Sequence, residues 1–524
     1  MAAISLVYFC IFIPANLTGA RDANMLALFE IDEYAQYPNV IRMLTPGPTP
    51  YQTLRNFTVY QHYFYGYPFY FFSALSLLPV RLVLGGDWIS HTPWIVAWLR
   101  QSINVLPMLA AILILVYLQT RFSSWQRSLG LYLFLLSVPV VIVNNLWWHP
   151  DSLVFLFIVL TLFFLDRDAL RFGPDFIFAA LASGLATGTK HLGVFFILAI
   201  PLYLVWGWRN KRISLRRALL LAGVFILLMA AAVVISNPLL LLPQERAEII
   251  ATQKLQFSQT SAGIITTTKE PYFQLGKYPQ DFRVHYGELV FVLVAVIALV
   301  IGILRPQKRL LHGLILAWMV PLSLTVTFTA TRRTHYFLPV MLPLFSALAN
   351  IPLNFASLKG MRLGVKEWMK ALSPMLATLV VVVQFLIFLR NDYTIYANQL
   401  QREQDSPSLA FYQKVQQNVI PRLPQKNLVV YRDWRIYFPA QPGWQVEMNW
   451  DLPNYTYLHD LNPDLILLEQ QNIREYSRPA IIEQAANPAN MRLIHEFYQN
   501  AALDAIPGYK KIFEDAFGAV FLRE

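Results

Sequence analysis

Long apolar runs recur along this chain and limit the folds that it can adopt. A run of about 18 or more apolar residues crosses a bilayer as an α-helix, because a helix satisfies its own backbone hydrogen bonds. The 524 residues are 56% hydrophobic and only 14% charged, whereas soluble proteins carry about a quarter charged residues. The sequence therefore predicts an α-helical polytopic membrane protein. About eleven spans are expected, near residues 4–17, 99–118, 128–146, 152–166, 175–189, 191–207, 216–236, 286–304, 310–330, 335–353 and 370–390.

The first apolar run has two interpretations. Residues 2–17 resemble the apolar part of a signal peptide, but no Lys or Arg precedes them, as it would in a signal peptide. We therefore expect an uncleaved first span. Cys10, the single cysteine, lies in this run, so neither an intrachain disulfide nor a thiolate metal site is expected.

Basic residues gather in short loops between the apolar runs. The strongest loops are 209–217, 305–309 and 359–370, and Arg121 and Arg127 mark a weaker one. Short loops rich in Lys and Arg face the cytoplasm, so we place all four there. This orientation accounts for the net charge of +11 without a nucleic-acid partner, and it favours a multi-pass protein of the plasma (inner) membrane.

The apolar run 64–84 is expected to lie at the membrane surface and not to cross. If 4–17 and 99–118 both cross, the segment between them begins and ends on the outer side. Pro68 and Pro79 also shorten the usable helix, since proline is poorly tolerated in the middle of a helix.

The chain is predicted to divide into a membrane domain, 1–390, and a soluble extracytoplasmic α/β domain, 391–524. Two outer segments of the membrane domain are expected, 18–98 and 237–285, the second with a short helix near 243–258. Alternating patterns in the soluble domain predict strands at 427–431 and 464–468 and helices at 406–419 and 470–486.

Ionisable residues occur at every expected outer junction. They are Glu30, Asp32 and Glu33, then His149 and Asp151, then Lys190 and His191, and finally Arg332, Arg333 and His335. Charges at a membrane face are costly and are kept where binding or chemistry needs them. The cations among them also lie on the side that the positive-inside rule disfavours, which indicates an anionic ligand. We therefore predict one cavity, open to the outer side.

Each of these residues has a simpler explanation when taken alone. Asp151 suits the first turn of a helix, and Lys190 can extend to the membrane interface. Arg100 at the outer end of a span is typical of a headgroup contact, and the pair Asp32 and Glu33 could be a solvated loop. The segment 166–168 has the Asp-Arg-Asp pattern of metal-binding transferases, but its predicted cytoplasmic position favours a solvated loop.

The order of these motifs resembles polytopic glycosyltransferases of the GT-C fold over about residues 20–350. The resemblance is to the polyprenyl-phosphate-mannose protein mannosyltransferase superfamily, whose bacterial relatives include the lipid A aminoarabinose transferases. The matching elements are Asp32-Glu33, Tyr67-Pro68, Trp98-Leu99-Arg100, His149-Pro150-Asp151, 189–195 and 333–339. The basic residue often found before the family's proline is missing here. The Trp-Trp-Asp-Tyr-Gly motif of oligosaccharyltransferases is also missing, which argues against transfer to asparagine.

The resemblance implies a membrane glycosyltransferase with a polyprenyl-phosphate sugar donor. A hexose or pentose would move by one inverting displacement to an extracytoplasmic hydroxyl of a protein, lipid or glycan. A carboxylate can take the proton of that hydroxyl, a role expected of Asp32, with Glu33 orienting the acceptor or substituting for the base.

The remaining residues are expected to bind the donor. Cations stabilise the charge on the departing phosphate, and the expected phosphate ligands are Lys190, Arg332, Arg333, His335 and Arg100. His149 and Asp151 are expected to position the sugar or to hold a divalent metal, which some members of the superfamily use.

A transporter or lipid flippase is the alternative from another class. Such proteins typically show repeated halves and helices broken near the middle of the membrane. We detect no internal repeat, and the ionisable residues lie at the ends of the expected spans, so the transferase is favoured.

Overall fold

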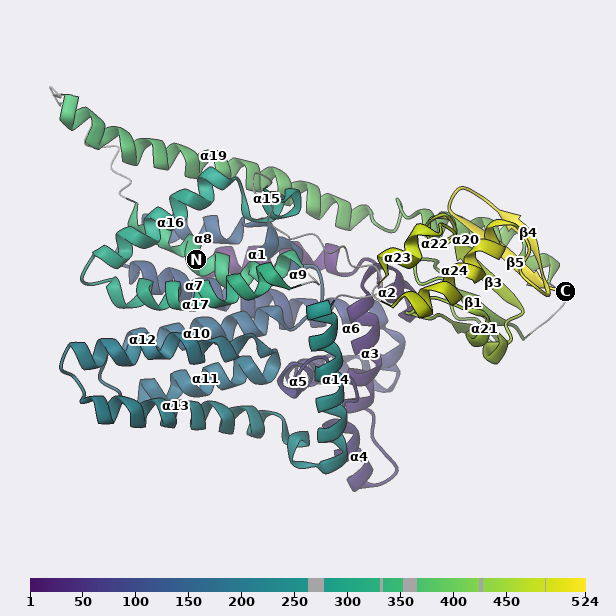
Figure 1. Ribbon diagram of the computed structural model, residues 1–524, viewed down its shortest axis with the longest axis horizontal. Helices are drawn as coiled ribbons and strands as arrows, with labels where there is room; N and C mark the ends of the chain where they lie inside the picture. The colour runs from purple at the N-terminus through teal and green to yellow at the C-terminus, as the bar shows by residue number, and fades with distance from the viewer. Residues whose placement is uncertain (263–277, 330–332, 352–364, 424–426, 486) are drawn as a thin grey trace.

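A helical bundle and a small α/β domain make up the protein, as Figure 1 shows. The computed structural model describes residues 1–262, 278–329, 333–351, 365–423, 427–485 and 487–524, with the backbone alone over 365–373. The predicted fold class, a helical membrane protein with a C-terminal α/β domain, is confirmed.

Apolar helices run lengthwise beside one another in the bundle (Figure 1). α11 packs between α10 and α13, and the buried Ala179, Ala180 and Ser183 on it let the backbones approach closely. The helices are α1 (Ala2–Asn16), α7 (Leu106–Thr120), α8 (Trp125–Leu136), α9 (Pro139–Asn145), α10 (Asp151–Asp168), α11 (Pro174–Thr189), α12 (Phe196–Arg209), α13 (Leu215–Ser236), α16 (Leu289–Leu304), α17 (Arg309–Phe328), α18 (Leu338–Ser346) and α19 (Val365–Gln401).

Several of these helices are long enough to cross a membrane. Among the described residues, six are long and apolar enough, or up to eight if each of two bent pairs forms one span. The six are Tyr67–Ser90, Thr92–Thr120, His191–Arg209, Leu215–Ser236, Arg309–Phe328 and Pro374–Gln401. The first of them contains residues 67–84 of the run 64–84. The surface position of that run stays a prediction, as does the number of about eleven spans.

The predicted span 128–146 is a bent pair of helices. α8 ends at Leu136, α9 begins at Pro139, and the two helices differ in direction by 62°. Proline disfavours the helical conformation of the residue before it, and Val138 is extended accordingly. Near the end of α9, the carbonyl of Asn144 accepts a hydrogen bond from Nδ2 of Asn104, which also donates to the carbonyl of His149, each at 3.1 Å.

Helices of the outer segments cover one end of the bundle. Of these, α3 and α14 run crosswise to α10–α13 (Figure 1), and α14 confirms the helix predicted near 243–258. The elements are α2 (Ala23–Phe29), α3 (Ile31–Met43), α4 (Pro50–Thr58), α5 (Tyr67–Leu84), η1 (Gly85–Ser90), α6 (Thr92–Leu99), η2 (Arg100–Val105), η3 (His191–Phe195), η4 (Pro238–Leu241), α14 (Pro243–Ala262), α15 (Gln280–Tyr286) and η5 (Thr334–Phe337). A further short helix, η6 (Ala347–Asn350), directly follows α18 and does not belong to this cover.

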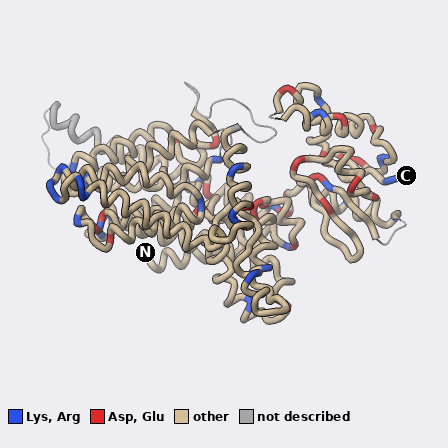
Figure 2. Tube along the Cα trace, turned by 60° about the horizontal axis from the view of Figure 1, so that its bottom comes forward, with Lys and Arg blue, Asp and Glu red and all other residues tan. Residues whose placement is uncertain are grey.

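Charge is distributed unequally between the two ends of the bundle. Figure 2 shows Lys and Arg gathered at the end away from the C-terminal domain, whereas acidic and basic residues mix at the covered end. This is the distribution that the basic loops predicted for a membrane protein with a positive inner face.

A five-stranded mixed sheet forms the centre of the C-terminal domain. Its order is β2-β1-β3-β5-β4, with β1 parallel to β2 and β3, and β5 antiparallel to β3 and β4. The strands predicted at 427–431 and 464–468 are confirmed as β1 and β3, while α19 continues past the predicted boundary at 390. The elements are α20 (Pro407–Asn418), η8 (Ile420–Arg422), β1 (Val429–Arg432), β2 (Gln445–Glu447), α21 (Tyr455–Leu461), β3 (Leu465–Glu469), α22 (Gln470–Tyr476), α23 (Ala480–Gln484), α24 (Pro488–Ala502), β4 (Tyr509–Glu514) and β5 (Gly518–Arg523).

Asp433 is buried at the carboxyl end of β1. Its carboxylate accepts hydrogen bonds from the backbone N–H of Glu469 at 2.8 Å, Nδ2 of Asn472 at 3.0 Å and the hydroxyl of Tyr498 at 2.8 Å. Burial raises the pKa of the Asp433 carboxyl to about 6, although these hydrogen bonds lower it. The folded domain therefore holds this proton to a higher pH than the unfolded chain does.

This difference predicts a pH dependence of stability. Between about pH 4 and pH 6 the unfolded chain releases the proton first, so the free energy of unfolding of the wild type, relative to Asp433→Asn, should fall by roughly 1–3 kcal/mol. Below that window the contribution is fully present. Thermal unfolding of the full-length protein across this range measures the difference. Asp460 is exposed, so the difference in free energy of unfolding between the wild type and Asp460→Asn should not change with pH in this range. If the difference between the wild type and Asp433→Asn also stays constant, the prediction is wrong.

Candidate active site

Glu33 and Arg100 form a buried ion pair beneath the covered end of the bundle. Nε of Arg100 donates to Oε1 of Glu33 at 2.8 Å and Nη2 donates to Oε2 at 2.6 Å, and neither side chain is exposed. Oε1 also accepts the backbone N–H of Trp148 at 2.5 Å. Nη1 of Arg100 donates to the carbonyls of Asn16 at 2.7 Å and Thr18 at 3.0 Å. The pair therefore joins the end of α1, the start of α3, η2 and the segment before α10.

A second group of charges meets where α10 begins and α11 ends. Nζ of Lys190 donates to Oδ1 of Asp151 at 2.6 Å, and Nδ1 of His149 lies 2.7 Å from Oδ2. Nε2 of His335 lies 3.7 Å from the same Oδ2. All four side chains are largely shielded from solvent. One carboxylate thus gathers cationic or protonatable groups from three separate parts of the chain.

Asp32 adjoins this group and is open to solvent. Its Oδ2 lies 3.8 Å from Nε2 of His149, and 40% of its side chain is exposed. Both Asp32 and Glu33 lie in the first turn of α3, where the helix dipole favours negative charge. Asp32, His149, Asp151 and Lys190 therefore form one connected series, which we call the acid–base series.

Aromatic rings enclose the acid–base series. The ring of Trp147 stacks on that of His149, with centroids 4.1 Å apart and an angle of 3°. The hydroxyl of Tyr65 is hydrogen-bonded to Nε2 of His149 at 2.7 Å, and Nζ of Lys190 lies 5.0 Å from the centre of the Tyr336 ring. None of these aromatic residues was predicted as part of the site, although Tyr336 lies within the quoted motif 333–339 and Trp147 lies two residues before His149.

The remaining predicted residues lie in different places. Arg333 is exposed and lies two residues before His335. Arg332 lies outside the described residues. Arg100 faces inward, and its guanidinium is occupied by Glu33 and two carbonyls. Its predicted contact with a donor phosphate stays untested.

Asn237 joins three elements next to Lys190. Its Nδ2 donates to the carbonyl of Gly188 at 3.1 Å, and its Oδ1 accepts the backbone N–H of Tyr67 at 2.8 Å. The backbone N–H of Gly66 donates to the carbonyl of Thr189 at 3.0 Å. These bonds fix the start of α5 against the end of α11, and with them the adjacent tyrosine and lysine of the site. A single asparagine carries no recognisable motif, so the sequence did not indicate it.

Replacing Gly66 with Ala should disrupt this junction. A Cβ at residue 66 would overlap the carbonyl of Gly188, and overpacking of this kind costs about 1–3 kcal/mol. We expect a lower thermal unfolding temperature of the purified protein. Gly86→Ala is the matched control, because nothing lies within 4 Å of a Cβ at that position. Equal unfolding temperatures for the two variants would show that the backbones at residues 66 and 188 move apart without a loss of stability.

Arg402 joins the C-terminal domain to the start of α3. Its Nη1 donates to Oε1 of Glu30 at 2.9 Å, and its Nε and Nη2 donate to Oγ1 and the carbonyl of Thr18 at 3.0 and 2.5 Å. Gly19 has φ of 69°, and a Cβ there would meet the Arg402 guanidinium. Burial raises the pKa of Glu30 to about 7, although Arg402 lowers it. No motif in the sequence indicated this contact.

The acidic residues do not match a divalent metal site. Among the described residues, no group of three or more His, Cys, Asp or Glu side chains is arranged to hold a metal ion. The ammonium of Lys190 also occupies Asp151 at 2.6 Å and would repel a dication there. We therefore derive no step through a metal.

The Asp-Arg-Asp segment at 166–168 is not the solvated loop that we expected. Asp168 is 1% exposed, and its carboxylate accepts the backbone N–H groups of Phe172 at 2.9 Å and Gly173 at 2.8 Å and the hydroxyl of Tyr203 at 2.5 Å. Asp166 pairs with Arg121. The expectation was wrong because Asp168 ends α10 and caps the turn that follows it.

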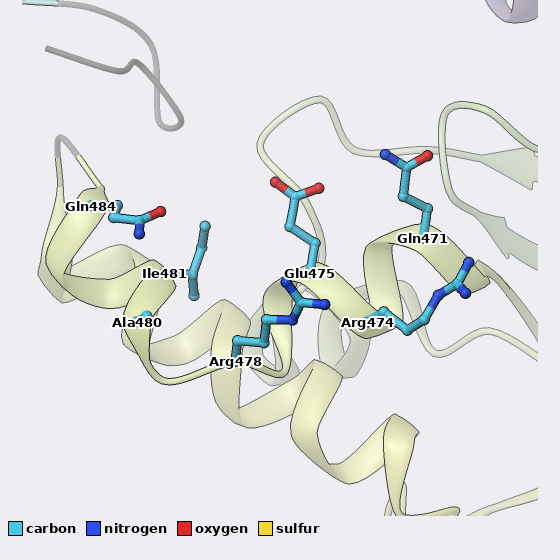
Figure 3. Close-up of a pocket in the computed structure, with 7 residues that line it drawn as sticks. All are labelled: Gln471, Arg474, Glu475, Arg478, Ala480, Ile481 and Gln484. Atoms are coloured by element: carbon cyan, nitrogen blue, oxygen red, sulfur yellow. The ribbon is translucent and has the colours of Figure 1, made fainter. Parts of the chain in front are cut away.

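A larger surface pocket lies elsewhere, in the C-terminal domain. It has a volume of about 500 Å³ and is lined by α22 and α23, with Gln471, Arg474, Glu475 and Arg478 around it (Figure 3). No residue of the acid–base series lines it. A smaller cavity of about 110 Å³ does adjoin the series, and Tyr65 and Lys190 line it together with His191 and Gln253.

The lengthwise bundle, the covered end with its charged residues and the appended sheet domain define a multi-pass membrane protein of the GT-C fold. ArnT from Cupriavidus metallidurans bound to undecaprenyl phosphate is 12% identical, with a TM-score of 0.53 over 99% of this chain and 96% of that chain. The apo state of ArnT gives a TM-score of 0.50 at 12% identity, over 99% and 97%.

The oligosaccharyltransferase of Archaeoglobus fulgidus in the apo form is also similar. It is 11% identical, with a TM-score of 0.51 over 99% of this chain and 74% of that chain. No family model matches the sequence, and no curated protein matches it. The structural likeness confirms the fold that the sequence motifs implied.

Proposed function

We propose that the protein is a glycosyltransferase that moves a sugar from a polyprenyl-phosphate donor to an extracytoplasmic acceptor hydroxyl. The observation that carries this proposal is the acid–base series. An exposed carboxylate on Asp32 and a shielded ammonium on Lys190 lie at one end of the bundle, joined through His149 and Asp151. The shared fold with ArnT, whose structure holds undecaprenyl phosphate, supports a lipid phosphate as the donor.

In this proposal the donor phosphate binds near Lys190. Its ammonium is 12% exposed and held by Asp151, so it is a preorganised cation that stabilises charge on the departing phosphate. Arg333, with Arg332 beside it in sequence, supplies further positive charge, and His335 completes the set. Arg100 is proposed to act as a positioning residue. Its guanidinium already donates hydrogen bonds to four oxygen atoms, which belong to Glu33, Asn16 and Thr18.

The transfer itself is a single displacement. The acceptor oxygen attacks the anomeric carbon, and the bond from that carbon to the phosphate oxygen breaks, with its electron pair leaving on the phosphate. Asp32 takes the proton of the acceptor hydroxyl. Attack opposite the leaving group inverts the anomeric centre. His149 and Asp151 keep Lys190 and the sugar in place.

The cavity of about 110 Å³ beside Lys190 is proposed to receive the donor sugar. Its walls combine tyrosine rings with the polar side chains of His191 and Gln253, which suits a ring that has both apolar faces and hydroxyl groups. Hexose or pentose, and protein, lipid or glycan as acceptor, remain the alternatives in this proposal.

A reconstituted transfer assay tests the function. The purified full-length protein in nanodiscs is incubated with polyprenyl-phosphate carrying a labelled hexose or pentose, and with cell-envelope acceptors. We expect labelled acceptor and free polyprenyl phosphate, and a loss of both products in Lys190→Met. Lys254→Met, which changes an exposed lysine of α14, is the matched control. Counterflow of label across a vesicle without transfer would instead support a transporter or flippase.

The proposed location is the plasma (inner) membrane, with the active site and C-terminal domain outside. Because Cys10 is the single cysteine, a Cys10→Ser background allows new cysteines to report their side. A cysteine at the exposed residue 460 should react with an impermeant reagent in intact cells. Reaction only after lysis would contradict this orientation.

A further inference from the structure

An apolar groove lies at the end of the bundle away from the acid–base series. It has a volume of about 370 Å³ and runs between α8 and α19, with η6 beside it. Leu131, Phe134, Leu348, Ile351, Val382 and Phe385 line it. α10 connects the two ends, and its 18 residues correspond to about 27 Å at 1.5 Å per residue. The groove is therefore distinct from the proposed transfer site.

Among the residues that the structure describes, two cations beside this groove have no acidic partner. Nη2 of Arg127, which lines the groove, donates to the carbonyl of Ala349 at 3.4 Å. Nζ of Lys308 donates to the carbonyl of Gln119 at 2.8 Å, and the Gln119 amide donates to Oγ of Ser346 at 3.0 Å. Arg127 thus contacts the segment 346–349 directly, and Lys308 is linked to it through Gln119.

These cations affect one another. Burial and the nearby Arg305, Arg127 and Arg121 lower the pKa of Lys308 to about 8. Arg121 is neutralised by Asp166, but in the part of the chain that the structure describes neither Arg127, Arg305 nor Lys308 has an ion pair. A group of uncompensated positive charges of this kind is complementary to a phosphate.

We propose that this groove binds one anionic phospholipid, with an acyl chain between α8 and α19 and its phosphate against Arg127 and Lys308. Basic pockets between membrane helices are suited to acidic lipid headgroups. Inorganic phosphate would pair with the cations but leave the apolar walls of the groove uncovered. A neutral lipid would cover the apolar walls but leave the cations without an anionic partner. The combination of groove and cations therefore selects an anionic lipid.

Two kinds of variant separate the contributions. Arg127→Gln combined with Lys308→Gln removes the charge, while Gly130→Leu fills the groove, since Gly130 lines it and nothing lies within 4 Å of a Cβ there. Arg216→Gln combined with Arg217→Gln is the matched control, because it removes two exposed cations from the start of α13. Gly130→Ala controls for the loss of a helical glycine.

The binding of phosphatidylglycerol to the full-length protein in detergent is measured by native mass spectrometry. We expect one retained lipid, bound about thirtyfold more weakly in the Arg127 and Lys308 double variant, at about 1 kcal/mol per cation. Gly130→Leu should lose it as well, and both controls should keep it. Thermal unfolding temperatures verify that each variant is folded.

Four results would each overturn the proposal. Equal retention in all variants would show that this groove is not the site. Unchanged retention in Gly130→Leu, with loss in the double variant, would show that the acyl chain does not enter the groove. Equal stabilisation by inorganic phosphate, or equal binding of phosphatidylcholine, would show that the combination of headgroup charge and acyl chain is not recognised.

Discussion

Asp32→Asn is expected to lower the rate of sugar transfer at least about a hundredfold, because general base catalysis contributes about 10²- to 10⁴-fold. The substitution keeps the size of the side chain but removes its capacity to accept the proton of the acceptor hydroxyl. Asp32 is 40% exposed and 3.8 Å from His149, so its replacement leaves the buried contacts intact. The thermal unfolding temperature should therefore stay close to that of the wild type, which separates a catalytic loss from an unfolded protein.

The matched control for this experiment is Asp87→Asn. Asp87 is exposed in η1, within the same outer segment, so the substitution repeats the chemical change away from the acid–base series. It should retain full activity. Near-wild-type transfer by Asp32→Asn, measured with saturating acceptor, would rule out Asp32 as the base and leave the proton to another group of the series.

Glu33→Ala should destabilise the fold by about 3–5 kcal/mol, the effect of leaving a buried charge without its partner. Arg100 is fully buried and receives both of its carboxylate contacts from Glu33. Loss of the carboxylate also leaves the backbone N–H of Trp148 without its acceptor. We expect most of the purified variant to aggregate on heating at temperatures at which the wild type stays monodisperse by size-exclusion chromatography.

An exposed ion pair provides the comparison. Arg283 and Glu288 pair at 2.6 Å with 52% and 39% of their side chains exposed, and such pairs contribute at most about 1 kcal/mol. Glu288→Gln should therefore have little effect. The double variant Glu33→Leu with Arg100→Met should recover part of the loss, because removing both charges removes the unpaired one. A Glu33→Ala protein as heat-resistant as the wild type would show that Arg100 finds other partners.

Much of the fold followed from local patterns. Continuous apolar runs predicted the bundle, and the short apolar runs around residues 429 and 466 predicted the two buried strands. Both predictions were possible because the pattern of apolar residues along the chain indicates which segments are buried. The length of α19 did not follow, because its residues beyond 390 are polar and gave no signal to continue the helix. That continuation depends on contacts such as the one between Tyr396 and the carbonyl of Ile11.

Some residues of the candidate site could be predicted, but their roles stay a prediction. The acidic and basic motifs identified Asp32, Asp151 and Lys190, and the structure brings them together. Adjacent residues of a helix point in directions about 100° apart, so Asp32 and Glu33 were bound to have different surroundings. Which of the two would be buried could not be foreseen. Which of the two faces inward is decided by Arg100, from another element.

The contact of Arg402 with Glu30 and Thr18 has a practical consequence for anyone shortening this chain. A cut after α19, the obvious place to separate a soluble module from a membrane one, would delete the only guanidinium that the described structure places on Glu30. Glu30, whose pKa burial raises to about 7, would then lose this ion-pair partner two residues before Asp32. The segment after α19 therefore contributes a contact at the end of the bundle that holds the acid–base series, and a shortened protein is expected to differ from the intact one in its pH dependence.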